Sequence, residues 1–281
     1  MLHGIAGAWV KLERAKEHIR HLELSIDGFL NARPPPYAVV AEEEPETRDK
    51  VYRVRGIKRF PLQWSAITGD CIHNIRSTLD ILWRGIWYPD GGGVGDRKTQ
   101  FSFFDSANEF EARYKRVEKS RLQTAVDIVR AFKPYKRGNE LFGLLIEADD
   151  IDKHRGISLV AGASNYLVAD FVPYVIGGPQ ITPEEIASLP GGPTRLPFMH
   201  ETVCPIEEGT ELHRVPFIIW SEKKVDVNPE FPIYIAFEES GPLNGKSVVA
   251  LLTQFLDIVA RLGDAFIKAG LLPSHWPPPK T

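Results

Sequence analysis

The chain has 281 residues, of which 43% are hydrophobic and 25% charged, a balance typical of a globular protein with a sizeable apolar core. Its net charge of −3 argues against a protein coated in positive potential for wrapping duplex DNA. Two cysteines without a CxxC pair argue against a disulfide framework, and no stretch approaches the roughly 18 uninterrupted apolar residues of a membrane span. We therefore expect a cytoplasmic protein that makes no use of a membrane.

The first part of the chain, residues 1–156, is predicted to be mainly helical. Apolar residues spaced three and four apart predict a long amphipathic helix from Ile5 to Leu30, and the proline triplet that follows ends it. A short β-hairpin is expected over residues 37–59. The same periodicity predicts further helices over residues 61–87, 107–117, 122–132 and 139–155. The apolar seam of the first helix is long enough to form a homodimer contact.

The predicted hairpin carries the most basic local cluster of the chain, made of Lys50, Arg53, Arg55, Lys58 and Arg59. Such charges commonly keep the edge of a sheet from pairing with a neighbouring molecule. They could also track a phosphate backbone, as in an RNA-binding protein. We favour the first interpretation.

The second part, residues 157–240, is predicted to be rich in β-structure, because β-branched and aromatic runs alternate there with Gly and Pro. A closing apolar helix over residues 245–270 is expected to return to the earlier helices, and residues 273–281 to form a flexible tail. The predicted fold is α+β: a helical bundle with a long N-terminal helix, packed with an antiparallel β-sheet. Because no flexible polar linker separates the two parts, we expect residues 1–281 to form a single unit.

Polar residues flank the apolar stripe of the second predicted helix. At about 100° per residue, His73, Arg76 and Asp80 fall within one arc of roughly 60°. Arg76 and Asp80 are four residues apart and can pair directly. Asn74 points elsewhere.

Charged residues occupy core-facing positions on the fifth predicted helix, since its apolar stripe continues into Asp152 and Arg155. Burying a charge without a partner costs several kcal/mol, on the order of what breaking a buried ion pair costs. The opposite charges of the second helix are the expected partners. We therefore predict two cross-helix pairs, Arg76 with Asp152 and Asp80 with Arg155.

These segments carry a family resemblance. The run GDCIHNIRSTLD from Gly69 to Asp80, together with the DKHR run from Asp152 to Arg155, resembles a widespread family of uncharacterised bacterial proteins. The likeness extends to the KPY run at 133–135 and the EGTEL run at 208–212, and so spans most of the chain. The family implies no established activity. A looser similarity is to the HEPN helical bundles, several of which are metal-independent ribonucleases in toxin and defence systems.

The HEPN ribonucleases carry an arginine a few positions before a histidine on a helix that faces the dimer mate. Neither His73 nor His154 has an arginine at that upstream distance. Arg14 and His21 fit the spacing approximately, but both belong to the solvent face of the first predicted helix. The likeness to HEPN proteins therefore does not extend to their catalytic motif.

Three roles remain open for the two polar segments. The one we favour is structural, a satisfied network of ion pairs that fixes how the helices register, with Asp80, Asp152 and Asn74 in structural or orienting roles. A second is a non-catalytic site in which the arginines bind an anionic small molecule or a partner protein. The third is catalytic.

In the catalytic hypothesis the protein cleaves RNA without a metal ion or cofactor. His73 and His154 act as general base and general acid, because the pKa of a histidine lies near neutrality. Arg76 and Arg155 stabilise the charge that develops on the phosphate, since a guanidinium binds phosphate oxygens bidentately.

Overall fold

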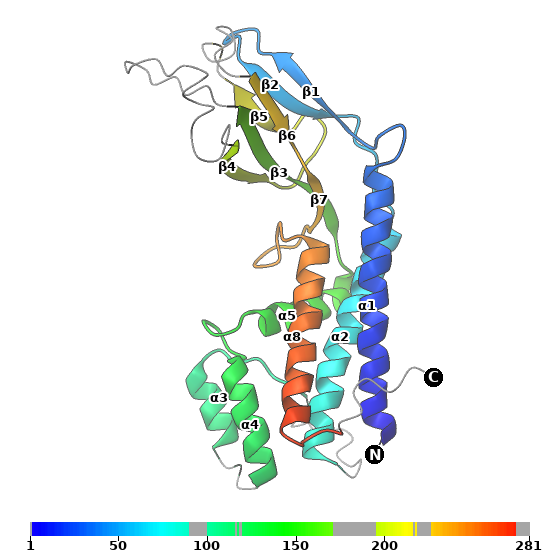
Figure 1. Ribbon diagram of the computed structural model, residues 1–281, viewed down its shortest axis with the longest axis vertical. Coiled ribbons are helices and arrows are strands. Elements are labelled where there is room, and N and C mark those ends of the chain that lie inside the picture. Colours follow the sequence, from blue (N-terminus) through cyan, green and yellow to red (C-terminus); the bar gives the residue numbers. More distant parts are fainter. Residues whose placement is uncertain are drawn as a thin grey trace, which may run out of the picture. The chain divides into compact units, whose positions relative to one another are not determined.

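The computed structural model describes residues 2–89, 100–115, 117, 120–170, 195–215, 217 and 226–273 (Figure 1). Its contacts divide the chain into a helical unit, made of Met1–Ser25, Pro61–Leu159 and Phe237–Thr281, and a sheet unit, made of Ile26–Phe60 and Val160–Ala236. The fold is α+β, as the sequence predicts. That the whole chain forms one packed domain stays a prediction. Most of the expected tail, residues 274–281, lies outside the described residues.

All six expected helices are present in the described part of the chain, with bounds that differ by a few residues from the predicted ones. They are α1 (Leu2–Leu30), α2 (Gln63–Trp87), α3 (Ala107–Tyr114), α4 (Ser120–Phe132), α5 (Leu141–Arg155) and α8 (Val248–Lys268). The closing helix α8 packs against α2, α4 and α5, and so completes the bundle as expected. No helix among the described residues is both long and apolar enough to cross a lipid bilayer.

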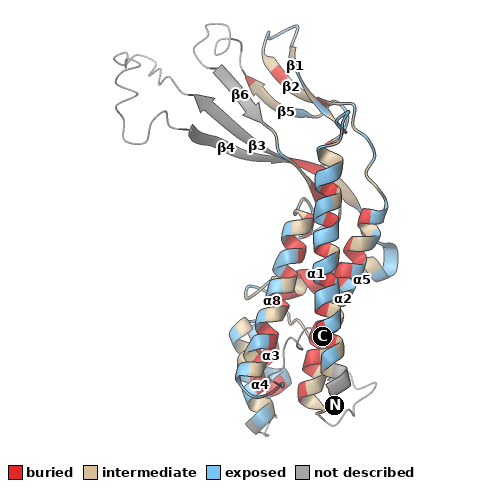
Figure 2. Cartoon of the chain, turned by 45° about the vertical axis from the view of Figure 1, so that its right-hand side comes forward, coloured by how far each residue is buried: buried red, intermediate tan, exposed pale blue. Residues whose placement is uncertain are grey.

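The core of the helical unit follows from the predicted apolar stripes. Five apolar residues of α2 are all buried: Ile72, Ile75, Leu79, Leu82 and Ile86. Figure 2 shows the buried residues of the helices in red. Each such side chain contributes about 1.5–3 kcal/mol when it leaves water. Repeated along several helices, this burial holds α2 at the centre of the bundle.

The first helix lies along α2. The hydroxyl of Thr78 donates a hydrogen bond of 3.1 Å to the carbonyl of Ala8, and the thiol of Cys71 donates one of 3.5 Å to the carbonyl of Ala15. The apolar seam of α1, which includes Leu12, is buried within the chain. A homodimer stays a prediction, and it would have to use a surface other than this seam.

The described residues of the sheet unit form two sheets. Strands β1 (Ala38–Glu43), β2 (Lys50–Arg55) and β5 (Glu211–Val215) form one, in the order β1-β2-β5. Strands β4 (Arg195–Val203), β3 (Leu159–Asp170) and β6 (Asp226–Glu230) form the other, and β7 (Ile233–Phe237) also pairs with β3. The predicted hairpin therefore belongs with the later strands and not with the helices that flank it in the sequence, because β2 pairs with β5.

Candidate functional site

The candidate site lies in the helical unit, where α2 and α5 approach at Gly69. A Cβ atom on Gly69 would stand 2.6 Å from Cγ of Asp152, closer than real Cβ contacts, so the Asp152 carboxylate occupies the space that a side chain would need. Burial raises the pKa of the Asp152 carboxyl, and the nearby carboxylates of Asp149 and Asp70 raise it further. Because Gly69 has no side chain, the Asp152 carboxyl can lie against α2, near those of Asp149 and Asp70.

The imidazole of His73 spans the two helices. Its Nδ1 lies 3.4 Å from Oδ1 of Asp149 on α5, and its Nε2 lies 3.3 Å from the hydroxyl oxygen of Ser77, one turn further along α2. The Asp149 side chain is 3% exposed, whereas that of His73 is 53% exposed. A half-exposed ring therefore rests against a buried carboxylate on one side and a hydroxyl on the other.

The two oxygens of Asp149 have different surroundings. Oδ2 pairs with the ammonium of Lys153, one turn along α5. Oδ1 is buried and accepts no well-aligned hydrogen bond from any described residue. The 3.4 Å contact from His73 is long for a hydrogen bond, but catalytic hydrogen bonds in ligand-free proteins often are. Oδ1 is therefore placed to orient the His73 ring.

Arg76 and Asp80 pair with each other and not with α5. Arg76 Nη1 contacts Oδ1 of Asp80, and Arg76 Nη2 donates a hydrogen bond of 3.0 Å to the carbonyl of Phe101. The amide of Phe101 in turn donates one of 2.9 Å to the Asp80 carboxylate. Burial raises the pKa of the Asp80 carboxyl, while the guanidinium of Arg76 opposes this rise. The pair fixes the backbone at Phe101 onto α2.

Arg155 also has a partner that the sequence does not suggest. It donates a hydrogen bond of 2.9 Å to Glu239, which is 5% exposed and also accepts one of 3.0 Å from the amide of Ser158. The predicted pairs Arg76–Asp152 and Asp80–Arg155 are therefore not formed. A partner one turn away satisfies Arg76, and a buried carboxylate far along the chain satisfies Arg155.

The two histidines of the catalytic hypothesis are not brought together by any contact. His154 is exposed, and its side chain makes no hydrogen bond or ion pair with the described residues. On the α5 helix it is rotated by roughly 140° from Asp149, which contacts His73. Asn74 accepts a hydrogen bond of 3.4 Å from Lys11 and so links α2 to α1, which fits the structural role expected of it.

Of two further residues of the site, Asp149 was not singled out from the sequence, and Ser77 was given no role there because its context is not that of a nucleophile elbow. Asp149 follows Leu145 by four positions, so the stripe that singles out Asp152 also includes it. Ser77 follows His73 by four positions and therefore lies on the same face of α2. Both could have been found by extending the same helical spacing.

Two of the five basic residues of the hairpin cluster, Arg53 and Arg55, form ion pairs with carboxylates of the sheet unit. Arg53 pairs with Glu44 at 2.8 Å, and Arg55 pairs with Glu42 at 2.7 Å. The hydrogen bond from Arg53 lowers the pKa of the Glu44 carboxyl. These ion pairs favour the interpretation of an edge protected by charges over that of a phosphate-binding surface.

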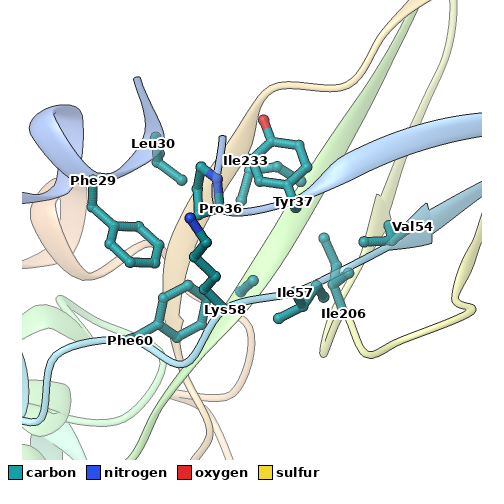
Figure 3. Close-up of a pocket in the computed structure, with 11 residues that line it drawn as sticks. Phe29, Leu30, Pro36, Tyr37, Val54, Ile57, Lys58, Phe60, Ile206 and Ile233 are labelled. Atoms are coloured by element: carbon teal, nitrogen blue, oxygen red, sulfur yellow. The ribbon is translucent and has the colours of Figure 1, made fainter. Parts of the chain in front are cut away.

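Two cavities lie outside the α2–α5 cluster. The first, in the sheet unit, is lined mainly by apolar side chains, with Tyr37 and Lys58 as its polar members (Figure 3). At about 10 Å³ it has room for one water molecule, and Lys58 donates a hydrogen bond of 3.2 Å to the carbonyl of Pro34. The second, in the helical unit, lies largely open at the surface and measures about 570 Å³, and its charged lining residues are Lys133, Glu140 and Arg261.

The described residues include no group of three or more His, Cys, Asp or Glu side chains arranged to hold a metal ion. Comparison with known proteins adds no assignment, since no protein-family model, curated protein or solved structure matches this chain. The resemblance to the uncharacterised bacterial family and to HEPN bundles therefore stays an expectation from the sequence motifs.

Proposed function

We propose that this protein catalyses hydrolysis through acid–base chemistry at His73, with Asp149 as the group that orients the imidazole. The observation that carries the proposal is the pairing of a half-exposed ring with a buried carboxylate across two helices. A carboxylate on Nδ1 fixes the proton there and leaves Nε2 free to accept one. His73 is then a general base that requires no second histidine.

In the same proposal the two arginines are structural. Arg76 is 12% exposed and holds the backbone of Phe101, and Arg155 holds the buried Glu239. This supports a structural role for both arginines, although neither joins α2 to α5 as the sequence interpretation expected. It weighs against RNA cleavage and against an anionic ligand at this site, because the expected phosphate-binding groups are already engaged.

Charge at the site favours an uncharged or cationic substrate. Besides burial, the nearby carboxylates of Asp149 and Asp70 raise the pKa of the Asp152 carboxyl, whereas His73 and Lys153 lower it. A polyanion such as RNA would be repelled by these carboxylates. Hydrolysis of an uncharged or cationic ester or amide therefore agrees better with the cluster than cleavage of a phosphodiester.

The test compares three substrates in the presence of EDTA: p-nitrophenyl acetate, acetylthiocholine and a single-stranded RNA. We expect turnover of an ester, with kcat/KM lowered by about 10²- to 10⁴-fold in His73→Gln, the usual contribution of a general base. His154→Gln is the matched control, because that ring is exposed on another face of α5. Equal losses in the two variants, or turnover of RNA alone, would contradict the proposal.

A second candidate, binding of an anionic small molecule, is favoured by the 570 Å³ cavity. Lys133 and Arg261 line this cavity, and neither forms an ion pair with a described residue. Arg261→Gln should then abolish any thermal stabilisation by pyrophosphate. Stabilisation that survives this substitution would place the anion elsewhere.

A further inference from the structure

We propose that Ser77 is a nucleophile activated by His73, so that Ser77, His73 and Asp149 act as a triad that hydrolyses uncharged carboxylic esters. This inference rests on the proposed function of His73 and adds the group that attacks the substrate. A triad is recognised by the geometry and roles of its members, whatever the fold or their order in the chain.

The hydroxyl of Ser77 has a partner that is unusual for a serine inside a helix. A serine or threonine inside a helix commonly donates to the carbonyl four residues earlier, and the neighbouring Thr78 does so, at 2.8 Å from the carbonyl of Asn74. Among the described residues, the Ser77 oxygen instead has the Nε2 of His73 as its side-chain partner, at 3.3 Å. The helix backbone therefore does not compete for the proton that a nucleophilic serine has to give up.

The exposure of the three side chains suits the chemistry of a triad. Asp149 is buried, His73 is half-exposed and Ser77 is partly exposed, so a substrate can reach the hydroxyl while the carboxylate stays shielded from water. Shielding strengthens the interaction between the carboxylate and the imidazolium that forms during the reaction. His73 is the most exposed of the three side chains, and Ser77 lies between it and the buried Asp149 in exposure.

The reaction is balanced by these groups and one water molecule. Ser77 Oγ bonds to the ester carbonyl carbon as its proton moves to His73 Nε2, and the alcohol leaves with that proton when its bond to the carbon breaks. Water then attacks the acyl group and gives a proton to Nε2. The bond to Oγ breaks, Ser77 regains a proton, and the carboxylic acid departs.

The experiment treats the full chain with an uncharged fluorophosphonate and maps the adduct by peptide mass spectrometry. We expect phosphonylation of Ser77, at a rate lowered at least tenfold in His73→Gln and in Asp149→Asn, in keeping with loss of the general base or its orientation. Ser65→Ala is the control, because Ser65 is a partly exposed serine on the same helix. Ser77 of the Ser65→Ala variant should be labelled at the same rate as Ser77 of the wild type.

No adduct on Ser77 of the folded wild-type protein would overturn the inference, and this result does not depend on the folding of any variant. Ester turnover that persists in Ser77→Ala but is lost in His73→Gln would also overturn it, while leaving His73 as a general base that activates water. Loss of turnover in Ser77→Ala together with a mapped Ser77 adduct would support the triad.

Discussion

Replacing Gly69 by alanine tests the contact between α2 and α5 on which the candidate site depends. In the interior of an exposed helix this change stabilises a protein by about 1 kcal/mol, because alanine has the higher helix propensity. Here the new Cβ would stand 2.6 Å from Cγ of Asp152. Forcing an extra methyl group into a packed contact costs about 1–3 kcal/mol. We expect Gly69→Ala to lower the free energy of unfolding by about 0–2 kcal/mol, the balance of these two effects.

Urea denaturation of four proteins measures this effect: the wild type, Gly69→Ala, Asp152→Ala and the double variant. Removing the Asp152 carboxylate clears the space, so Gly69→Ala should become stabilising in the Asp152→Ala background. Gly7→Ala in α1 is the matched control, because a Cβ there would meet nothing within 4 Å. If Gly69→Ala stabilises the otherwise wild-type protein as much as Gly7→Ala does, the close approach of the helices is wrong.

Three further predictions concern charge and burial. The pKa of Asp152 is raised above its ordinary value of 3.8. Between the pKa of the unfolded state and the higher pKa of the folded state, the folded protein holds a proton that the unfolded chain releases, so stability falls as the pH rises through this range. Asp152→Asn should therefore raise the Tm at neutral pH and change it little well below the ordinary pKa. Arg155→Ala should lower the free energy of unfolding by about 1–2 kcal/mol, because Glu239 stays buried with one hydrogen bond fewer, and no loss would contradict that pairing. Burial raises the pKa of the Cys71 thiol to about 12, so a thiol reagent should modify Cys71 only after unfolding.

Local patterns predict the helices well because an apolar stripe determines which face of a helix is buried. The stripe of α2, from Ile72 to Ile86, was expected from spacing alone and is buried. The partners of the charges were not predicted, because they depend on tertiary structure. Glu239, which binds Arg155, lies 84 residues away in the sequence, and no spacing rule connects the two.

The placement of the hairpin was missed for the same reason. Strand β2 pairs with β5, so Lys50 stands opposite Val215 across more than half of the chain. Long-range strand pairing leaves no periodic signal in either segment. The acidic residue Asp149, in contrast, was within reach of the sequence, because it lies on the stripe that already included Asp152.

The orientation of His73 by Asp149 is tested most directly by the tautomer of the imidazole. Long-range proton–nitrogen NMR spectra of protein labelled with ¹⁵N-histidine report which ring nitrogen carries the proton. His73→Gln would assign the His73 signal among the eight histidines. We predict that neutral His73 carries its proton on Nδ1, facing Asp149, and that Asp149→Ala returns it to the Nε2–H tautomer that free histidine favours. A His73 ring protonated on Nε2 in the wild type would contradict the proposed role of Asp149 and, with it, the general base.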